Sequence, residues 1–255
     1  MNSNSSDPNW ARDLNRDAWN AGRYDAWVSA VGSPEAEARA LVADPAHKLR
    51  RLLPHLGEVA GQRICSIQGS NGRVAVALAL LGAEVTVLDF GEDNRRYALE
   101  LAASAGVEID YRLGDVIEAG SLGLNSRFDA VVMELGILHY HQDLTRFFGV
   151  MADLAKDGGV LVLNEFHPVE RKLFQTIEGV PHDYFNAELV MGDVPNPTGE
   201  AKSLAKCALR YWTLGEIVTA VIAAGFRIEK LEEHPGWTDP TIPGTFTLVA
   251  STSPP

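Results

Sequence analysis

Residues 64–90, ICSIQGSNGRVAVALALLGAEVTVLDF, contain the pattern that decides the fold of this chain. An apolar run enters a turn that contains glycine, an alanine-rich helical segment follows, and a second apolar run ends at Asp89. Short continuous apolar runs are typical of strands that are buried on both faces of a parallel sheet. The stretch therefore predicts a strand–helix–strand unit of the kind that binds nucleotides at the turn.

Apolar runs and helical segments alternate through most of the chain after Gly61. Strands are predicted at 62–67, 84–89, 107–112, 128–134 and 159–165. Helices are predicted at 72–81, 93–105 and 142–156, with an irregular connection at 117–126. Alternation of this kind indicates a parallel sheet that is covered by helices on both faces.

The last part of the chain departs from this alternation. An apolar segment at 211–226 is a predicted helix, and Thr213 and Glu216 have the spacing of a capping box at its start. Two further runs, 227–235 and 245–251, follow with only a loop between them, as in an antiparallel hairpin. We therefore predict a Rossmann-like, doubly wound α/β fold. Its seven-stranded sheet is mostly parallel and has an antiparallel C-terminal hairpin strand.

Helical periodicity in residues 10–57 predicts an N-terminal helical region, in which Ser33-Pro34-Glu35 marks a helix start. We assign residues 1–57 to a helical lid and residues 58–255 to the α/β domain. Residues 166–210, which are richer in Pro, Gly and His, are predicted to be an insertion between the fifth strand and the last helix.

The 255 residues carry a formal net charge of −12. Nucleic acids and anionic membranes bind basic surfaces, so we expect neither as a partner. No apolar run reaches the roughly 18 residues of a membrane span, and the N-terminus lacks the apolar region of a secretory signal. We therefore expect a cytoplasmic protein with a small-molecule partner, and a homo-oligomer remains open.

Four segments give the chain a resemblance to a known enzyme family. They are the turn after the first strand, FDAVVMELGILHYHQDL (128–144), LAKDGGVLVLNEFHP (154–168) and WTLGEIVTAVIAAGFRIEKLEE (212–233). In order and spacing, residues 57–252 resemble the small-molecule branch of the class I S-adenosylmethionine-dependent methyltransferases. The resemblance implies S-adenosyl-L-methionine as the cofactor and N-terminal helices that fold over it.

The turn itself departs from the family pattern D-x-G-x-G-x-G. The matching positions are Ser66, Gln68, Ser70 and Gly72. We expect Gly69, Asn71 and Gly72 to supply the tight turn, because Asn tolerates the left-handed conformation better than most residues. Loss of the acid at Ser66 implies either weaker cofactor binding or compensation by another carboxylate, such as Glu134.

Candidate cofactor residues follow from the resemblance and from the position of ligands at the carboxyl ends of parallel strands. The resemblance implies that Asp89 binds the ribose hydroxyls, that Asp115 holds the adenine amino group, and that Tyr24 is a lid tyrosine. The full set is Tyr24, Gln68, Gly69, Ser70, Asn71, Gly72, Asp89, Phe90, Gly114, Asp115, Val116, Glu134 and Leu135.

Side chains after the fourth and fifth strands are candidates for the chemistry. The catalytic candidates are His139, Glu165 and His167, and a structural or orienting role is the preferred alternative for His139. His167 and His182 could be metal ligands, but no third ligand stands at a convincing spacing, so no metal site is predicted. The substrate-binding candidates are Trp19, Tyr140, Tyr184, Arg210 and Trp212, with ordinary packing as the alternative for each.

The predicted function is methyl transfer from S-adenosylmethionine to N, O or C of a metabolite by in-line displacement. A general base is needed only where the acceptor must lose a proton. Two alternatives remain open. One is a non-catalytic binding or scaffold member of the fold, because Ser66 and Gln68 depart from the family pattern. The other is a nicotinamide-dependent oxidoreductase, which the missing glycines and the C-terminal hairpin disfavour.

Overall fold

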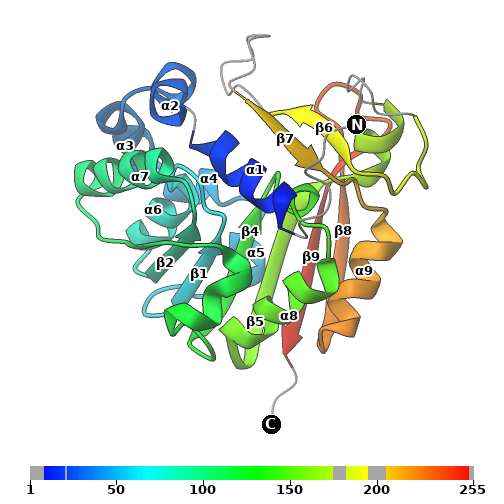
Figure 1. Cartoon of the computed structure of the whole chain (residues 1–255). Helices are drawn as coiled ribbons and strands as arrows, with labels where there is room; N and C mark the ends of the chain where they lie inside the picture. The colour runs from blue at the N-terminus through cyan, green and yellow to red at the C-terminus, as the bar shows by residue number, and fades with distance from the viewer. Residues whose placement is uncertain (1–8, 21, 175–181, 195–204, 253–255) are drawn as a thin grey trace.

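A computed structural model describes residues 9–20, 22–174, 182–194 and 205–252 (Figure 1). Its centre is a seven-stranded sheet in the order β3-β2-β1-β4-β5-β9-β8. The strands are β1 (Arg63–Ile67), β2 (Glu84–Asp89), β3 (Asp110–Leu113), β4 (Phe128–Glu134), β5 (Ala155–Phe166), β8 (Phe226–Pro235) and β9 (Pro243–Thr252). Neighbours among β1 to β5 are parallel, and β9 is antiparallel to both β5 and β8. The predicted mostly parallel sheet with an antiparallel C-terminal strand is confirmed.

Alternate residues of the central strands point to opposite faces of the sheet. The covering helices are α6 (Arg73–Leu80), α7 (Glu92–Ala105), α8 (Leu144–Leu154) and α9 (Leu214–Ala223). Cys65 and Val131 pack in one buried cluster with α8 and α9, whereas Ile64 and Val132 pack in another with α6 and α7. Because β1 and β4 are buried on both faces, their sequences are continuous apolar runs.

The N-terminal region contains short helices that differ in where they pack. They are α1 (Trp10–Trp19), α2 (Arg23–Val31), α3 (Pro34–Ala43), α4 (Pro45–Lys48) and α5 (Leu53–Leu56). Leu41, Leu49 and Leu52 belong to the same buried cluster as β1 and α6, so the chain from α3 to α5 is part of the core. Figure 1 shows α1 crossing the end of the sheet at which the parallel strands finish.

Two helix starts that the sequence predicts are confirmed. Ser33 Oγ accepts a hydrogen bond from Ala36 N at 3.3 Å, with Pro34 in the first turn of α3. Thr213 and Glu216 form a reciprocal capping box at the start of α9, with bonds of 3.2 and 2.8 Å. Each cap joins residues that are three positions apart, so both helix starts can be predicted without knowledge of the rest of the fold.

Two strands begin three or four residues away from their predicted starts, and each difference has a local cause. β3 begins at Asp110 rather than at residue 107, because Gly106 ends α7 with φ of 73° and pairing with β2 starts at Asp110. β5 begins at Ala155, inside the predicted helix 142–156, because Ala155 pairs with Phe128 ahead of a register shift. The irregular connection after β3 contains a 3₁₀ helix, η1 (Val116–Leu122).

The insertion contains a two-stranded sheet that the sequence does not predict. β6 (Val190–Asp193) pairs antiparallel with β7 (Lys206–Leu209). A single π-helical turn, η3 (Glu170–Phe174), follows β5. The predicted insertion also includes residues 175–181 and 195–204, which lie outside the described residues.

Helix α1 is bound to this small sheet. The Asn15 side chain donates to Ala208 O at 3.0 Å and accepts from Ala208 N at 2.7 Å, so it extends the hydrogen bonding of β7. A small buried cluster joins the two elements and consists of Ala18, Val194, Cys207 and Leu209. We call α1 together with β6 and β7 the roof, because Figure 1 shows them over the carboxyl ends of the large sheet.

Candidate functional site

A cavity of about 240 Å³ lies at the carboxyl ends of β1, β2 and β4. We call it the strand-end cavity. Its wall includes the predicted cofactor residues Gln68, Gly69, Ser70, Asn71, Asp89, Phe90, Glu134 and Leu135. Trp19 and Tyr140, which the sequence suggests as substrate-binding residues, also line it. The cavity therefore joins three strand ends with side chains of the N-terminal helices.

The turn after β1 keeps a glycine-like backbone at the positions where the family has glycine. φ is 46° at Gln68, 49° at Ser70 and 77° at Gly72. The expectation that Gly69 and Asn71 provide left-handed residues is wrong, because neither has a positive φ. The left-handed conformation costs a non-glycine residue roughly 1–2 kcal/mol. Neighbouring contacts must therefore hold Gln68 and Ser70 in place.

Hydrogen bonds fix both residues. Gln68 Oε1 lies 2.8 Å from His141 Nε2, and a side-chain oxygen only accepts, so His141 donates from Nε2. Burial lowers the pKa of His141 to about 3, which keeps the imidazole neutral. Ser70 N donates to Asp89 Oδ2 at 3.0 Å, and Tyr111 Oη donates to Ser70 O at 2.9 Å.

The same turn combines a closely packed glycine with a buried hydroxyl that has no partner among the described residues. A Cβ atom on Gly69 would lie 2.8 Å from both Ser66 Oγ and Val87 Cγ1, so only glycine fits between them. Ser70 Oγ is buried and has no hydrogen-bond partner among the described residues. Because a buried hydroxyl without a partner is unfavourable, this atom is suited to a ligand's polar group.

Asp89 ends β2 with its carboxylate in the wall of the strand-end cavity. Oδ1 accepts from Gly91 N at 2.7 Å and lies 3.5 Å from Asn94 Nδ2, and Oδ2 accepts from Ser70 N. Burial raises the pKa of this carboxyl, while the bonds from Gly91, Ser70 and Asn94 oppose that rise. The carboxylate thus ties the β1 turn to the β2 turn and retains lone pairs for a ligand's hydroxyl groups.

An ion pair crosses the strand-end cavity, and the sequence does not suggest this pair. Lys48 Nζ, at the end of α4, contacts Glu134 Oε2, at the end of β4, and both side chains line the cavity. A second pair lies beside it, with Arg73 Nε 2.6 Å from Glu37 Oε1. Lys48 is missed because KLRRLL resembles an ordinary helix surface, and no local signal relates it to Glu134.

Glu165 anchors the loop that follows β4. Its carboxylate accepts hydrogen bonds of 2.6–3.1 Å from the backbone N–H groups of Gly136, Ile137, Leu138 and Phe166. Leu135 and Gly136 have φ of 52° and 82° and line the strand-end cavity. The carboxylate of Glu165 is therefore used to position this part of the cavity wall.

The two candidate histidines lie outside the wall of the strand-end cavity. His139 lines a second cavity of about 30 Å³, together with Glu165 and Trp212. Burial, with the nearby charge of Arg171, lowers the pKa of His139 to about 3. His167 is 2% exposed and lies 2.9 Å from Glu233 through Nε2, while its Nδ1 accepts from Val169 N.

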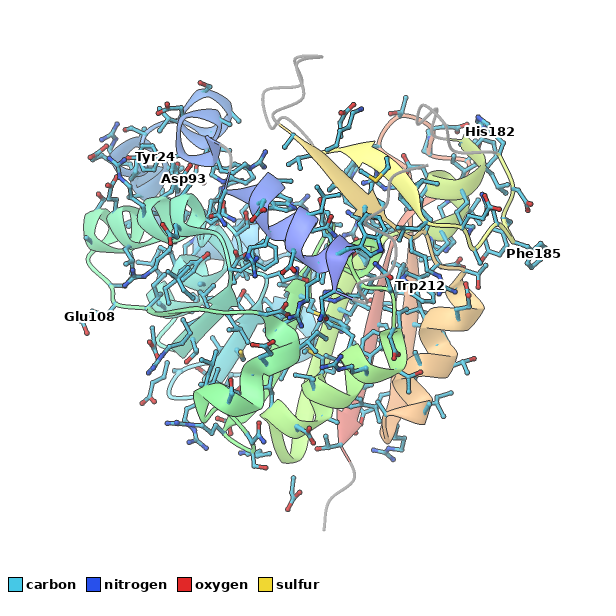
Figure 2. All side chains as sticks on the ribbon, in the orientation of Figure 1. Tyr24, Asp93, Glu108, His182, Phe185 and Trp212 are labelled. Atoms are coloured by element: carbon cyan, nitrogen blue, oxygen red, sulfur yellow. The ribbon has the colours of Figure 1, made fainter. Side chains whose placement is uncertain are left out.

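The remaining substrate-binding candidates contact other parts of the chain. Trp212 donates from Nε1 to Leu138 O and His141 O at 3.1 and 3.2 Å. Arg210 stacks on the Trp212 ring at 3.6 Å and pairs with Glu216. Tyr184 Oη accepts from Leu214 N at the start of α9. None of these three lines the strand-end cavity, and Figure 2 shows Trp212 within the fold near α9.

Tyr24 also faces away from the strand-end cavity, toward α7. Its backbone N–H donates to Asp93 Oδ2 at 3.2 Å, and its hydroxyl contacts Glu100 (Figure 2). Trp27, one helical turn further along α2, lines the cavity instead and donates to Asn94 Oδ1 at 2.8 Å. A helix has about 3.6 residues per turn, so only one of its faces is directed toward the cavity. The sequence does not reveal which residues lie on that face.

The predicted adenine-binding segment lies beneath α1 and beside the strand-end cavity. Arg12 Nε of α1 lies 3.1 Å from Asp115 Oδ2, and Asp115 Oδ1 caps η1 by accepting from Ile117 N. Val116 belongs to the buried core. Gly72 and Gly114 lie in turns and do not line the strand-end cavity.

Within the described part of the chain, no group of three or more His, Cys, Asp or Glu side chains could hold a metal ion. His182 lies apart from His167 and contacts Leu173 O through Nδ1 at 2.8 Å. Among the same residues, no helix has both the length and the apolar character needed to span a bilayer.

Comparison with known proteins shows which families this chain is similar to. A family model described as "Methyltransferase domain" matches residues 67–163, which include the β1 turn, Asp89 and the loop after β4. A ubiquinone biosynthesis O-methyltransferase of Methylobacterium nodulans is 32% identical over 157 residues. That match covers 62% of this chain and 56% of the relative, so it spans little more than half of the relative's length.

Solved structures show the same fold. An S-adenosylmethionine dependent methyltransferase from Mesorhizobium loti matches with a TM-score of 0.59 and 23% identity, over 83% of this chain and 99% of that chain. The magnesium protoporphyrin IX methyltransferase of Synechocystis PCC 6803, with bound SAH, matches with a TM-score of 0.61 and 16% identity, over 95% of this chain and all of that chain (100%). Residues 67–163 therefore match a methyltransferase domain, and the chain as a whole has the Rossmann-like fold of these solved methyltransferases.

Proposed function

We propose that this protein transfers a methyl group from S-adenosylmethionine to a nucleophilic atom of a small molecule. The observation that carries the proposal is the strand-end cavity, in which a glycine-like turn, a buried Asp89 carboxylate and the loop after β4 converge. The name of the Methylobacterium nodulans relative favours oxygen as the acceptor atom over nitrogen or carbon.

The residues present fit such a cofactor on two grounds. Ser70 Oγ is a buried hydroxyl with no partner among the described residues, so a polar group of the ligand can supply one. Asp89 offers carboxylate lone pairs for vicinal hydroxyl groups, as the family resemblance implies for the ribose. Because the turn carries side chains at Gln68 and Ser70, it suits this cofactor better than a dinucleotide, whose pyrophosphate needs close backbone approach.

The chain's own residues act by positioning and by excluding water. When bound, S-adenosylmethionine would supply an electrophilic methyl group on a positively charged sulfur, with a neutral thioether as the leaving group, and a hydroxyl acceptor would release its proton to water. Trp19 and Trp27 cover the strand-end cavity, and Tyr140 stands in its wall with its ring centroid 5.7 Å from that of Trp19. These side chains would hold the two reactants in line, which is how positioning accelerates a displacement.

We infer that His139, Glu165 and His167 are positioning residues rather than general bases. The Glu165 carboxylate already accepts four backbone hydrogen bonds, and His167 is bound to Glu233. His139 lies behind Gly136, in the second cavity rather than in the strand-end cavity. This assignment replaces the catalytic roles that the sequence suggests for these residues.

Calorimetry with S-adenosylhomocysteine tests the proposal directly. We expect binding by the wild-type protein and a loss of affinity of about tenfold or more in Asp89→Ala, since a bond to a charged group is worth about 1.5–3 kcal/mol. Asp157→Ala, at an exposed position after α8, should bind like the wild type. Failure of the wild type to bind either S-adenosylmethionine or S-adenosylhomocysteine would favour a non-catalytic member of the fold.

A further inference from the structure

The Lys48–Glu134 ion pair is the feature of the strand-end cavity that the proposed reaction leaves unexplained. Lys48 comes from the N-terminal helices and Glu134 from the end of β4, and their side chains are 20% and 16% exposed. The pair is therefore accessible from the cavity but largely shielded from bulk water. A pair in such a place interacts more strongly than one on an open surface.

The surroundings of this pair leave Glu134 as the negative charge at its end of the cavity. Ser66, at the end of β1, is 3% exposed and carries no charge. The Asp89 carboxylate accepts from the β1 and β2 turns and is assigned to the ligand's hydroxyl groups, and Glu37 is bound to Arg73 at 2.6 Å. Among the described residues, the Glu134 carboxylate pairs with Lys48 alone.

We propose that the amino-acid end of S-adenosylmethionine inserts into this pair, with its ammonium on Glu134 and its carboxylate on Lys48. The inference rests on the proposed function and adds a specificity determinant to it. The ligand's α-ammonium and α-carboxylate are adjacent opposite charges, so each protein charge exchanges one partner for another. Neither Lys48 nor Glu134 is left buried without a counter-charge before or after binding.

This exchange makes the site selective for a complete zwitterion. A ligand that carries only the ammonium displaces Lys48 from Glu134 and leaves the lysine without a partner, which is costly in a shielded site. A ligand with neither charge leaves the pair intact and gains nothing from it. The cavity should therefore discriminate among ligands that share the adenosine and thioether parts but differ at the amino-acid end.

The experiment measures the affinities of two ligands by calorimetry. S-adenosylhomocysteine carries the zwitterion, whereas 5′-methylthioadenosine has the same adenosine and thioether without it. The variants are Lys48→Met, Glu134→Gln and the double variant, which removes both charges together. The matched control is Lys156→Met with Asp129→Asn, which removes the ion pair between β5 and the start of β4.

We expect S-adenosylhomocysteine affinity to fall about tenfold or more in each single variant and in the double variant, as for the loss of a charged hydrogen bond. Affinity for 5′-methylthioadenosine should stay within about twofold of wild type in the double variant, which also shows that the adenosine part of the site is folded. The control variants should leave both affinities unchanged.

The outcomes separate this inference from the proposed function. Suppose that the wild type binds S-adenosylhomocysteine. If the double variant then loses affinity for both ligands equally, or keeps its affinity for both, the exchange is overturned while the proposed function stands. If the wild type binds neither ligand, the proposed function fails and the exchange fails with it. A loss confined to S-adenosylhomocysteine supports both.

Discussion

At the scale of single residues, the left-handed backbone of Ser70 has a measurable cost. Ser70→Gly should relieve roughly 1–2 kcal/mol of strain, offset by about 0.5–1 kcal/mol of added chain entropy in the unfolded state. We therefore expect urea unfolding of the ligand-free protein to show a net gain of about 0.5–1 kcal/mol. Affinity for S-adenosylhomocysteine should fall, because the buried hydroxyl is lost.

Ser126 provides the matched control for this prediction. It has φ of 51° and is exposed in the turn before β4, away from the strand-end cavity. Ser126→Gly should gain similar stability without any change in ligand affinity. A Ser70→Gly protein less stable than wild type would show that the Ser70 side chain, rather than its backbone, governs stability at the turn.

The buried carboxylate of Glu165 supports a second prediction at this scale. Glu165→Gln keeps one acceptor oxygen but directs an NH₂ group at backbone donors, so the protein should lose about 2–3 kcal/mol of stability in urea unfolding. Ligand affinity should fall as well, because the loop at Leu135 and Gly136 is no longer held. Glu108→Gln, exposed at the edge of the molecule in Figure 2, is the matched control and should behave like the wild type.

At the scale of elements, the contact between α1 and β7 holds the roof together. Asn15→Ala removes both hydrogen bonds to Ala208 and leaves a buried N–H and C=O without partners, a loss of about 1–3 kcal/mol. We expect faster hydrogen exchange in α1 and at Ala208, with little change in α6. Asp17→Ala, on the exposed side of α1, should leave exchange unchanged. Equal acceleration in α6 would mean that the whole fold, rather than the roof, had been loosened.

The elements that could be predicted from sequence are those with local or periodic signals. Buried strands such as β1 and β4 are continuous apolar runs, and the caps at Ser33 and Thr213 lie within one turn of the residues they bond. The β6–β7 pair has neither signal. Its strands are four residues long, and their buried side chains are covered by α1, which is distant in sequence.

The same distinction separates the predicted and missed parts of the candidate site. Asp89 and Glu134 end apolar strands, so the topology alone brings them to one edge of the sheet. Lys48 and Trp27 reach the strand-end cavity only because α2 and α4 pack against the body of the domain. The orientation of those helices depends on contacts with residues far along the chain, which periodicity does not specify.

At the scale of the whole molecule, buried neutral histidines make stability depend on pH. Burial lowers the pKa of both His139 and His141 to about 3, below the value near 6.5 of an unfolded chain. The unfolded chain therefore binds more protons at intermediate pH, and stability that is present above pH 6.5 is lost as pH falls toward 3. Each group contributes up to about 1.4 kcal/mol per pH unit.

Urea unfolding at several values between pH 7.5 and 5 measures this dependence. His139→Gln should reduce the slope of unfolding free energy against pH, because one of the two imidazoles is gone. Each histidine keeps some exposed surface, so the measured slope should lie below the upper value. Identical slopes in the variant and the wild type would show that other groups dominate acid unfolding.

The Asn15–Ala208 contact also bears on how the protein is made. Its two residues lie 193 positions apart, so a ribosome must synthesise most of the chain before α1 can find β7. Until then the apolar side of α1, with Ala11 and Ala18, has no partner in the small sheet, while β1 to β4 already have their parallel neighbours. A nascent chain halted before residue 206 would contain every residue that lines the strand-end cavity but would lack β7, the strand that holds α1 in place.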